Sequence, residues 1–195
     1  MPTTTQEEKE KLRRELLGIR SSAAPASLRA ASDQISSHLP LIEAYLSATT
    51  ITAYWPKLGG NEINTRQIIA DALERNVSVF LPRVTNWASG TMEHVRYRGQ
   101  RLLKANRYGL FEPREENGVL SFDVEIALVP CVAADSKGFR LGYGRGFYDR
   151  YLSQSNATKI GLVLASGIRH ELPHNAHDIA MDWIVTEDGP SKCVP

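Results

Sequence analysis

The residues best suited to chemistry in this sequence lie in a glycine-rich segment, residues 135–150, which follows a predicted buried strand. Glycines at alternate positions allow backbone N–H groups to approach a phosphate closely. They are Gly142, Gly144 and Gly146. Arg140 and Arg145 offer fork-shaped cationic donors for phosphate oxygens, and Asp149 offers the hard carboxylate oxygen that Mg²⁺ prefers. The segment therefore predicts a phosphate-binding loop beside a magnesium ligand.

A glycine-rich loop has a second, purely structural interpretation, because glycines also occur in ordinary turns and where a helix packs closely on a strand. Two arginines and an aspartate in one strand-loop-helix setting favour phosphate binding over that alternative. The loop lacks the Gly-Lys-Ser or Gly-Lys-Thr of a Walker motif, and it does not have the spacing of the dinucleotide-binding fingerprint. The residues alone thus predict a bound phosphate without identifying the ligand.

The run Gly138 to Leu152, GFRLGYGRGFYDRYL, preceded by Asp135, resembles the signature of the 5-formyltetrahydrofolate cyclo-ligase family. Shorter matches in family order cover essentially the whole chain. They are Lys9 to Arg13, Glu62 to Thr65, Leu81 to Arg83, Gly109 to Pro113, Val129 to Pro130, Leu172 to Pro173 and His177 to Asp178.

This resemblance implies a ligase that forms a C–N bond. The implied reaction is the ATP- and Mg²⁺-dependent cyclisation of 5-formyltetrahydrofolate to 5,10-methenyltetrahydrofolate, with release of ADP and phosphate. Phosphorylation of the formyl oxygen creates a leaving group, and N10 of the same folate attacks the formyl carbon. No protein nucleophile is needed.

The resemblance also assigns roles to individual residues. The residues implied to bind ATP are Lys9, Arg13, Arg140, Leu141, Gly142, Tyr143, Gly144, Arg145, Gly146, Phe147 and Tyr148. Those implied to contact the folate are Trp55, Glu62, Tyr143, Gly144, Arg145, Gly146 and Phe147. Those implied to act in catalysis are Arg140, Arg145 and Tyr148, and the implied Mg²⁺ ligands are Asp149 and Asp178.

Four of the residues assigned outside the loop have a simpler alternative. Lys9 and Arg13 lie one helical turn apart, which also suits a solvated basic helix face. Trp55 follows a predicted strand, where a tryptophan is as readily part of the core as of a binding site. Asp178 by itself would also suit a helix cap.

Three changes depart from the family pattern. A phenylalanine expected before Asp135 is replaced by Ala134, and an aromatic residue followed by glutamine is replaced by Ser166 and Gly167. Arg145 stands where lysine is typical, which keeps the charge but changes its geometry. These changes leave open a related ATP-dependent enzyme with another substrate. A non-catalytic nucleotide- or folate-binding regulatory module is a further alternative.

The elements that position these residues alternate between strands and helices. Strands are predicted over residues 49–55, 77–81, 92–97, 124–129, 160–165 and 183–186. Helices are predicted from a capping box at Thr5 to Glu8, from about Pro25 to a break at Pro40, from Asn64 or Thr65 to Asn76, and over residues 147–152. This order predicts one α/β domain over residues 1–195, a three-layer α/β/α sandwich with a mostly parallel, Rossmann-like central sheet. Residues 84–122 are the least regular, and we expect them at the surface beside the site.

Composition limits the classes of function. The chain has 23 Lys and Arg against 22 Asp and Glu, so it lacks the positive field of a dedicated nucleic-acid binder. Its 2 cysteines suit a reducing compartment, and neither a secretory signal nor a membrane span is evident. We therefore expect a cytoplasmic monomer with a small-molecule substrate. His170, His174 and His177 match no standard zinc spacing, and Cys131 is expected to be a small core residue.

Overall fold

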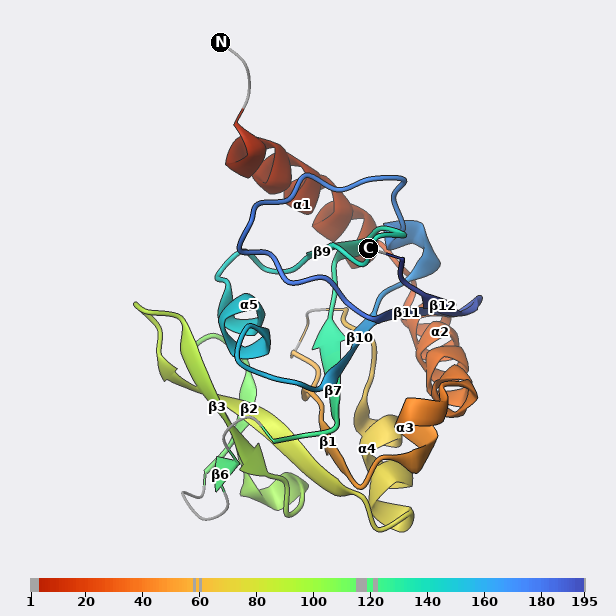
Figure 1. Cartoon of the computed structure of the whole chain (residues 1–195), viewed down its shortest axis with the longest axis vertical. Coiled ribbons are helices and arrows are strands. Elements are labelled where there is room, and N and C mark those ends of the chain that lie inside the picture. The colour runs from red at the N-terminus through yellow and green to blue at the C-terminus, as the bar shows by residue number, and fades with distance from the viewer. Residues whose placement is uncertain (1–3, 58, 60, 115–118, 121–122, 195) are drawn as a thin grey trace.

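The computed structural model describes residues 4–57, 59, 61–114, 119–120 and 123–194. Five parallel strands form its centre, in the spatial order β11 (Trp183–Thr186), β10 (Thr158–Leu162), β7 (Ile126–Pro130), β1 (Thr50–Thr52) and β2 (Ser78–Asn86) (Figure 1). Antiparallel strands extend both edges: β12 (Gly189–Lys192) beside β11, and β3 (Thr91–Arg96) then β6 (Val119–Leu120) beside β2. The predicted mostly parallel sheet is confirmed.

Alternate residues of the central strands face two separate cores, as the two-residue period of a strand requires. Ile51 pairs with Val79 on one side and Ile126 on the other, and all three belong to the larger core. Ala127 and Val129 belong to the second core on the opposite face. Because both faces are buried, the strands are apolar almost throughout.

Helices cover the two faces unequally. The larger core lies under α2 (Pro25–His38), the 3₁₀ turn η1 (Leu39–Leu41), α3 (Glu43–Ser47) and α4 (Arg66–Glu74). The opposite face carries only the short α5 (Phe147–Leu152) with long loops, and α1 (Thr5–Ser21) crosses above the carboxyl ends of the strands (Figure 1). The three-layer sandwich is confirmed, with one helical layer much thinner than the other.

The predicted helix starts are close but not all correct. The capping box of α1 joins Thr4 and Glu7, one residue before the predicted pair, because the two pairs have the same spacing. Before α4 the Thr65 hydroxyl donates to the Tyr54 carbonyl instead of capping, and the Asn64 side chain accepts from the Arg66 amide at 3.2 Å. The predicted break at Pro40 is confirmed by the turn that follows α2.

Asn76 ends the α4 region as predicted, with a left-handed backbone at φ 61°. Strands β1 and β10 are shorter than predicted, since the chain leaves the sheet after Thr52 and Leu162 to enter loops. The region 84–122 is more regular than predicted. It contains the β2–β3 hairpin and a second small sheet of β4 (Leu103–Ala105) with β5 (Phe111–Pro113).

A third small sheet lies next to the glycine-rich loop, and it joins β8 (Ala133–Ala134) to β9 (Arg140–Leu141). It fixes both ends of the turn that precedes the loop. Among the helices of the described residues, none has the length and apolar character needed to cross a membrane.

Candidate active site

A cavity of about 450 Å³ opens above the carboxyl ends of the parallel strands β1 and β7. Open parallel sheets bind ligands at this end. Tyr54 and Trp55 after β1 and Pro130 at the end of β7 form its floor, while α1, the glycine-rich loop and the β2–β3 hairpin surround it. One side of the cavity carries charged residues, Lys9, Arg13, Arg140, Asp149 and Asp178, and is called the charged side below. The other carries aromatic residues, Trp55, Trp87, Tyr108, Phe111 and Phe147, and is called the aromatic side.

The glycine-rich loop needs glycine at two of the three predicted positions. Gly144 and Gly146 adopt φ +87° and +68°, a region that L side chains rarely enter. A Cβ at Gly144 would also lie 2.9 Å from Cζ of Arg13. Gly142 has open space around it and no such backbone requirement, so its predicted conformational role is wrong. The helix after the loop has six residues, so the loop amides contribute most of the positive potential predicted here.

The predicted cations of α1 point into this cavity. Arg13 donates from Nε to the Gly142 carbonyl at 2.7 Å and so holds the loop against the helix. Lys9, only 7% exposed, forms an ion pair with Asp178. The alternative of a solvated basic face is therefore wrong for both residues.

The two predicted metal ligands lie side by side although they are far apart in sequence. Asp149 Oδ1 accepts from Arg140 at 3.0 Å and from the Ile179 amide at 3.1 Å, which places it next to Asp178. Asp178 Oδ2 accepts from Lys9 and from the Asn175 amide. Burial alone would raise the pKa of Asp178, but these hydrogen bonds and the charge of Lys9 outweigh it and lower that pKa.

Glu62 lines the same cavity, and its carboxylate is held from both sides. Its Oε1 accepts from the Tyr143 hydroxyl at 2.6 Å, and its Oε2 accepts from the Lys57 amide at 2.6 Å. Glu62 as a residue is only 8% exposed, so these donors take the place of water around its carboxylate. The Tyr143 side chain thus connects the glycine-rich loop to Glu62.

Tyr148, predicted to be catalytic, lines the cavity beside Glu62 and Arg140. Burial raises the pKa of Tyr148 well above its ordinary value, and the charge of Glu62 raises it further. Its hydroxyl keeps its proton at neutral pH and can donate a hydrogen bond. Arg145 also lines the cavity and is exposed, while its carbonyl accepts from the Arg150 guanidinium.

The aromatic side was only partly predicted. Trp55 belongs to the larger core, stacks on Tyr97 at 5.8 Å and also lines the cavity. Its interpretation as a core residue is confirmed, and its contact with the folate stays a prediction. Trp87 at the tip of the β2–β3 hairpin was missed. Its ring lies 3.9 Å from that of Tyr108 and 5.3 Å from that of Phe147. The only sign of Trp87 in the sequence was the prediction that residues 84–122 lie at the surface beside the site.

Glu112 on β5 is a further cavity residue that the residue types did not reveal. It lines the aromatic side, where Oε1 accepts from the Val84 amide at 3.1 Å. Burial raises the pKa of Glu112, and the Val84 hydrogen bond opposes that shift. Glu112 lies within Gly109 to Pro113, one of the short matches to the family in the sequence, but that match gave it no role.

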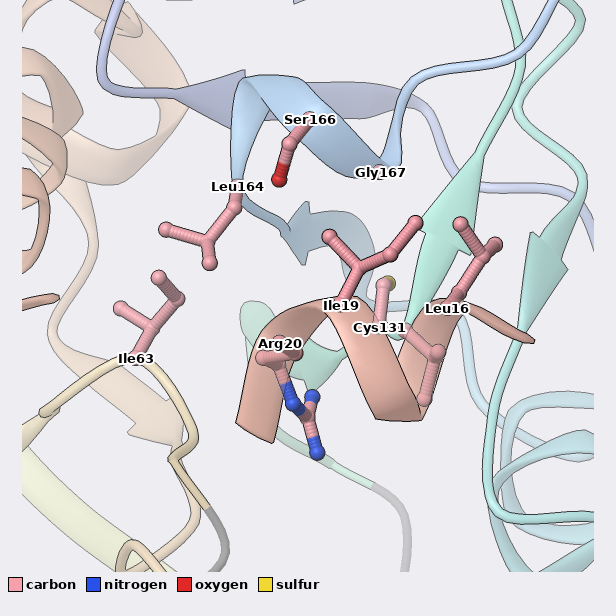
Figure 2. A pocket seen from close by; sticks show the side chains of 9 residues that line it. Leu16, Ile19, Arg20, Ile63, Cys131, Leu164, Ser166 and Gly167 are labelled. Carbon is pink, nitrogen blue, oxygen red and sulfur yellow. The ribbon is translucent and has the colours of Figure 1, made fainter. Parts of the chain in front are cut away.

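The two departures at Ala134 and Gly167 lie outside this cavity. Ala134 is fully buried in β8, and its backbone bridges to Ile168. Gly167 borders a separate space of about 10 Å³ beneath α1, where Figure 2 shows it with Ser166 across from Leu16. Neither residue lines the cavity, so the geometry gives no support to the idea that these two changes alter the substrate.

His174 and Cys131 have structural contacts. The ring of His174 stacks on Phe139 at 3.7 Å, and no cluster of three His, Cys, Asp or Glu suited to a metal occurs among the described residues. Burial raises the pKa of Cys131 to about 12, so its thiol is unreactive at neutral pH. Cys131 is a core residue, as predicted.

Comparison with known proteins decides the family. The model of the 5-formyltetrahydrofolate cyclo-ligase family matches residues 5–187. The chain belongs to this family. A relative named 5-formyltetrahydrofolate cyclo-ligase from Haemophilus influenzae is 32% identical over 181 residues, covering 90% of this chain and 95% of the relative. One from Mycolicibacterium smegmatis is 34% identical over 152 residues, covering 72% of this chain and 75% of the relative.

Solved structures agree with this family assignment. The 5,10-methenyltetrahydrofolate synthetase of Aquifex aeolicus superimposes with a TM-score of 0.82 at 28% identity, covering 96% of this chain and 93% of that one. A Mycoplasma pneumoniae protein with a TM-score of 0.74 at 19% identity shows the same fold. The cyclo-ligase family member described here is therefore an enzyme of the ligase class.

Proposed function

We propose that this cyclo-ligase family member uses ATP and Mg²⁺ to convert 5-formyltetrahydrofolate to 5,10-methenyltetrahydrofolate, releasing ADP and phosphate. The observation that carries the proposal is the joining of two ligand environments in one cavity. Lys9, Arg13 and Arg140 suit a triphosphate, while Glu62 and the aromatic side suit a flat heterocycle. The shared cavity would place the two ligands in contact.

Asp149 and Asp178 have the donor chemistry for Mg²⁺. Each uses one carboxylate oxygen for the hydrogen bonds described above, which leaves its second oxygen for a metal. Mg²⁺ is commonly held by one or two carboxylates, with substrate phosphates and water completing its shell. A pair of aspartates within the described residues, with no third acidic partner, fits that pattern.

When bound, ATP with Mg²⁺ supplies a phosphoryl group that turns the formyl oxygen into a leaving group. N10 of the folate closes the ring on the formyl carbon, and that oxygen departs with the phosphate. Both steps require alignment more than covalent help from the protein. This reaction needs no nucleophile from the protein, and the unreactive thiol of Cys131 is consistent with that.

The chain's residues would divide this work by position. Lys9, Arg13 and Arg140 neutralise negative charge on the transferring group. Glu62 accepts paired hydrogen bonds from the amino edge of the pterin ring, for which a carboxylate has two oxygens. Tyr148, protonated at neutral pH, donates to an oxygen near the reacting carbon. The aromatic side would cover the ring system and exclude water.

A cytoplasmic location is part of this proposal. The cysteines Cys131 and Cys193 are both buried and free, which suits a reducing compartment.

The test is the near-ultraviolet absorbance of methenyltetrahydrofolate after purified protein is mixed with 5-formyltetrahydrofolate, ATP and Mg²⁺. We expect a rise that requires all three components and matches the ADP released. A flat trace from a folded, ATP-binding protein would contradict the proposal. ADP release without folate dependence would favour another substrate, and ligand binding without any turnover would favour a regulatory module.

A further inference from the structure

Three side chains form a continuous hydrogen-bonded chain from α1 to the folate end of the cavity. Arg20 donates from its guanidinium to the Tyr143 hydroxyl oxygen at 2.6 Å, and that hydroxyl donates its proton to Glu62 Oε1 at 2.6 Å. The direction follows from chemistry, because Arg has only donors and a carboxylate has only acceptors. We call these three residues the relay.

Because Arg20 and Glu62 are both buried, each depends on the Tyr143 hydroxyl between them as a hydrogen-bond partner. Arg20 is 9% exposed and Glu62 is 8% exposed, so both charges are largely removed from water. A buried charge needs a compensating partner. Within the described residues the two groups form no direct ion pair, and the Tyr143 hydroxyl joins them instead.

Arg20 lies outside the main cavity. Figure 2 shows its stem beside the small space near Ile63 and Leu16, with the guanidinium directed away from Gly167. The end of α1 is also fixed to the segment that carries Glu62, because the Asn61 side chain donates to the Arg20 carbonyl at 3.2 Å. Arg20 therefore reaches the ligand site through another residue.

We propose that Arg20 is a positioning residue that orients Glu62 through the Tyr143 hydroxyl and so sets the affinity for the folate. This inference rests on the proposed function. A carboxylate offers about four lone-pair positions. Tyr143 and the Lys57 amide use one on each oxygen of Glu62, which fixes the plane of the carboxylate and leaves one on each oxygen for a paired donor of the substrate.

The relay is separate from the contact that holds the phosphate-binding part of the loop. Arg13 binds the Gly142 carbonyl at 2.7 Å, one residue before Tyr143, and does not depend on the tyrosine hydroxyl. Loss of the Arg20 guanidinium should therefore weaken folate binding while leaving ATP binding nearly unchanged.

The test uses Tyr143→Phe, Arg20→Met and the double variant. Phenylalanine removes only the hydroxyl, and methionine keeps an apolar stem beside the small space while removing the charge. Each single variant should bind 5-formyltetrahydrofolate about tenfold more weakly by calorimetry without ATP, as expected for a lost hydrogen bond to a charged group. For Arg20→Met, whose side chain lies outside the cavity, KM for ATP and kcat should change less than about twofold. The double variant should also be weakened only about tenfold, since Arg20 acts through the hydroxyl.

Tyr45→Phe is the matched control, because Tyr45 is a buried tyrosine of α3 outside the cavity. It should leave folate affinity unchanged, and thermal unfolding of every variant checks the fold. Multiplied losses of about 100-fold in the double variant would overturn the relay, as would an equal rise of KM for ATP. A wild-type protein that neither binds nor converts the folate overturns the proposed function and the relay together. Normal turnover with unaffected variants overturns the relay alone.

Discussion

The charged and aromatic sides of the cavity are held in place by different forces. On the charged side, Arg140 fixes Asp149 and Lys9 fixes Asp178, and two backbone amides complete the hydrogen bonds of the aspartates. On the aromatic side, Trp87 makes ring contacts with Tyr108 and Phe147 at the tip of a hairpin. Ion pairs with several hydrogen bonds fix geometry narrowly, whereas ring contacts tolerate displacement. The difference suits one side for phosphoryl transfer and the other for holding a ring.

The largest effect should come from the charged side. Asp149→Asn keeps an oxygen for Arg140 and the Ile179 amide but removes the charge that a metal requires. We expect kcat to fall about 10³-fold, roughly 4 kcal/mol of transition-state stabilisation, in the absorbance assay. Asp182→Asn is the matched control, because Asp182 also accepts from a backbone amide and pairs with Lys159, outside the cavity. Activity and Mg²⁺ dependence near wild type in Asp149→Asn would remove Asp149 from the metal site.

The next effect should come from Gly144→Ala. The added Cβ combines a disfavoured φ of +87° with a 2.9 Å approach to the Arg13 guanidinium, so the loop must change its conformation and Arg13 must give up its present position. We expect kcat/KM for ATP to fall about 100-fold, roughly 2.7 kcal/mol. Gly18→Ala in α1 serves as control, since nothing lies within 4 Å of its added Cβ. Equal activity of the two variants would show that the loop conformation is not needed.

Acidification should reduce the free energy of unfolding through His94, on the β2–β3 hairpin that carries Trp87, and should leave the Lys9–Asp178 pair of the charged side intact. His94 on β3 is fully buried, lies 3.9 Å from the Tyr151 ring, and has no hydrogen-bond partner for either ring nitrogen among the described residues. Burial lowers the pKa of His94 to about 3, while a histidine in the unfolded chain has a pKa of about 6.5. Because the unfolded state binds the proton more readily, stability is complete above about pH 6.5 and falls as the pH is lowered. The expected loss between pH 7 and pH 5 is about 2 kcal/mol.

Chemical unfolding at the two pH values measures this loss, and His94→Phe should remove most of it. The Lys9–Asp178 pair should contribute equally at both, because the lowered pKa of Asp178 confines its loss to more acidic solutions. An unchanged pH dependence in His94→Phe would show that His94 is not the buried neutral group.

The smallest effect should come from Trp87→Ala. Removal of the ring takes away the contacts to Tyr108 and Phe147, and with them part of the wall beside the folate. We expect KM for 5-formyltetrahydrofolate to rise about tenfold, roughly 1.4 kcal/mol. Trp87→Phe, which keeps a ring, should show a smaller rise in the same steady-state assay. A rise in KM for ATP instead would place the nucleotide on the aromatic side.

The sequence predicts the charged side better than the aromatic side for a physical reason. Phosphate and metal binding need particular residue types at close spacing, as in the run from Arg140 to Asp149, so a local motif identifies them. Asp178 could be assigned only through the family resemblance, because the fold brings it beside Asp149. Trp87 and Glu112 have ordinary local surroundings, and only the β2–β3 hairpin and β5 place them in the cavity.

The fold was predictable from the sequence wherever apolar residues follow a clear strand or helix pattern. The apolar strands at 77–81 and 124–129 gave the parallel centre correctly, and the alternation of strands and helices gave the layers. Strand β3 was predicted at residues 92–97, but β6 and the small sheet of β4 and β5 were not, since such short strands contain too few residues for a clear pattern. Arg20 was also missed, because its partner Tyr143 is 123 positions away.

The division of the cavity into a nucleotide side and a folate side is tested most directly by a crossed comparison of Michaelis constants. Arg13→Met and Trp87→Ala would each be assayed for both substrates under the same conditions. The account predicts that Arg13→Met raises KM for ATP about tenfold with little change for the folate, and that Trp87→Ala does the reverse. Parallel rises in both constants for either variant, in a protein that unfolds at the wild-type temperature, would contradict it.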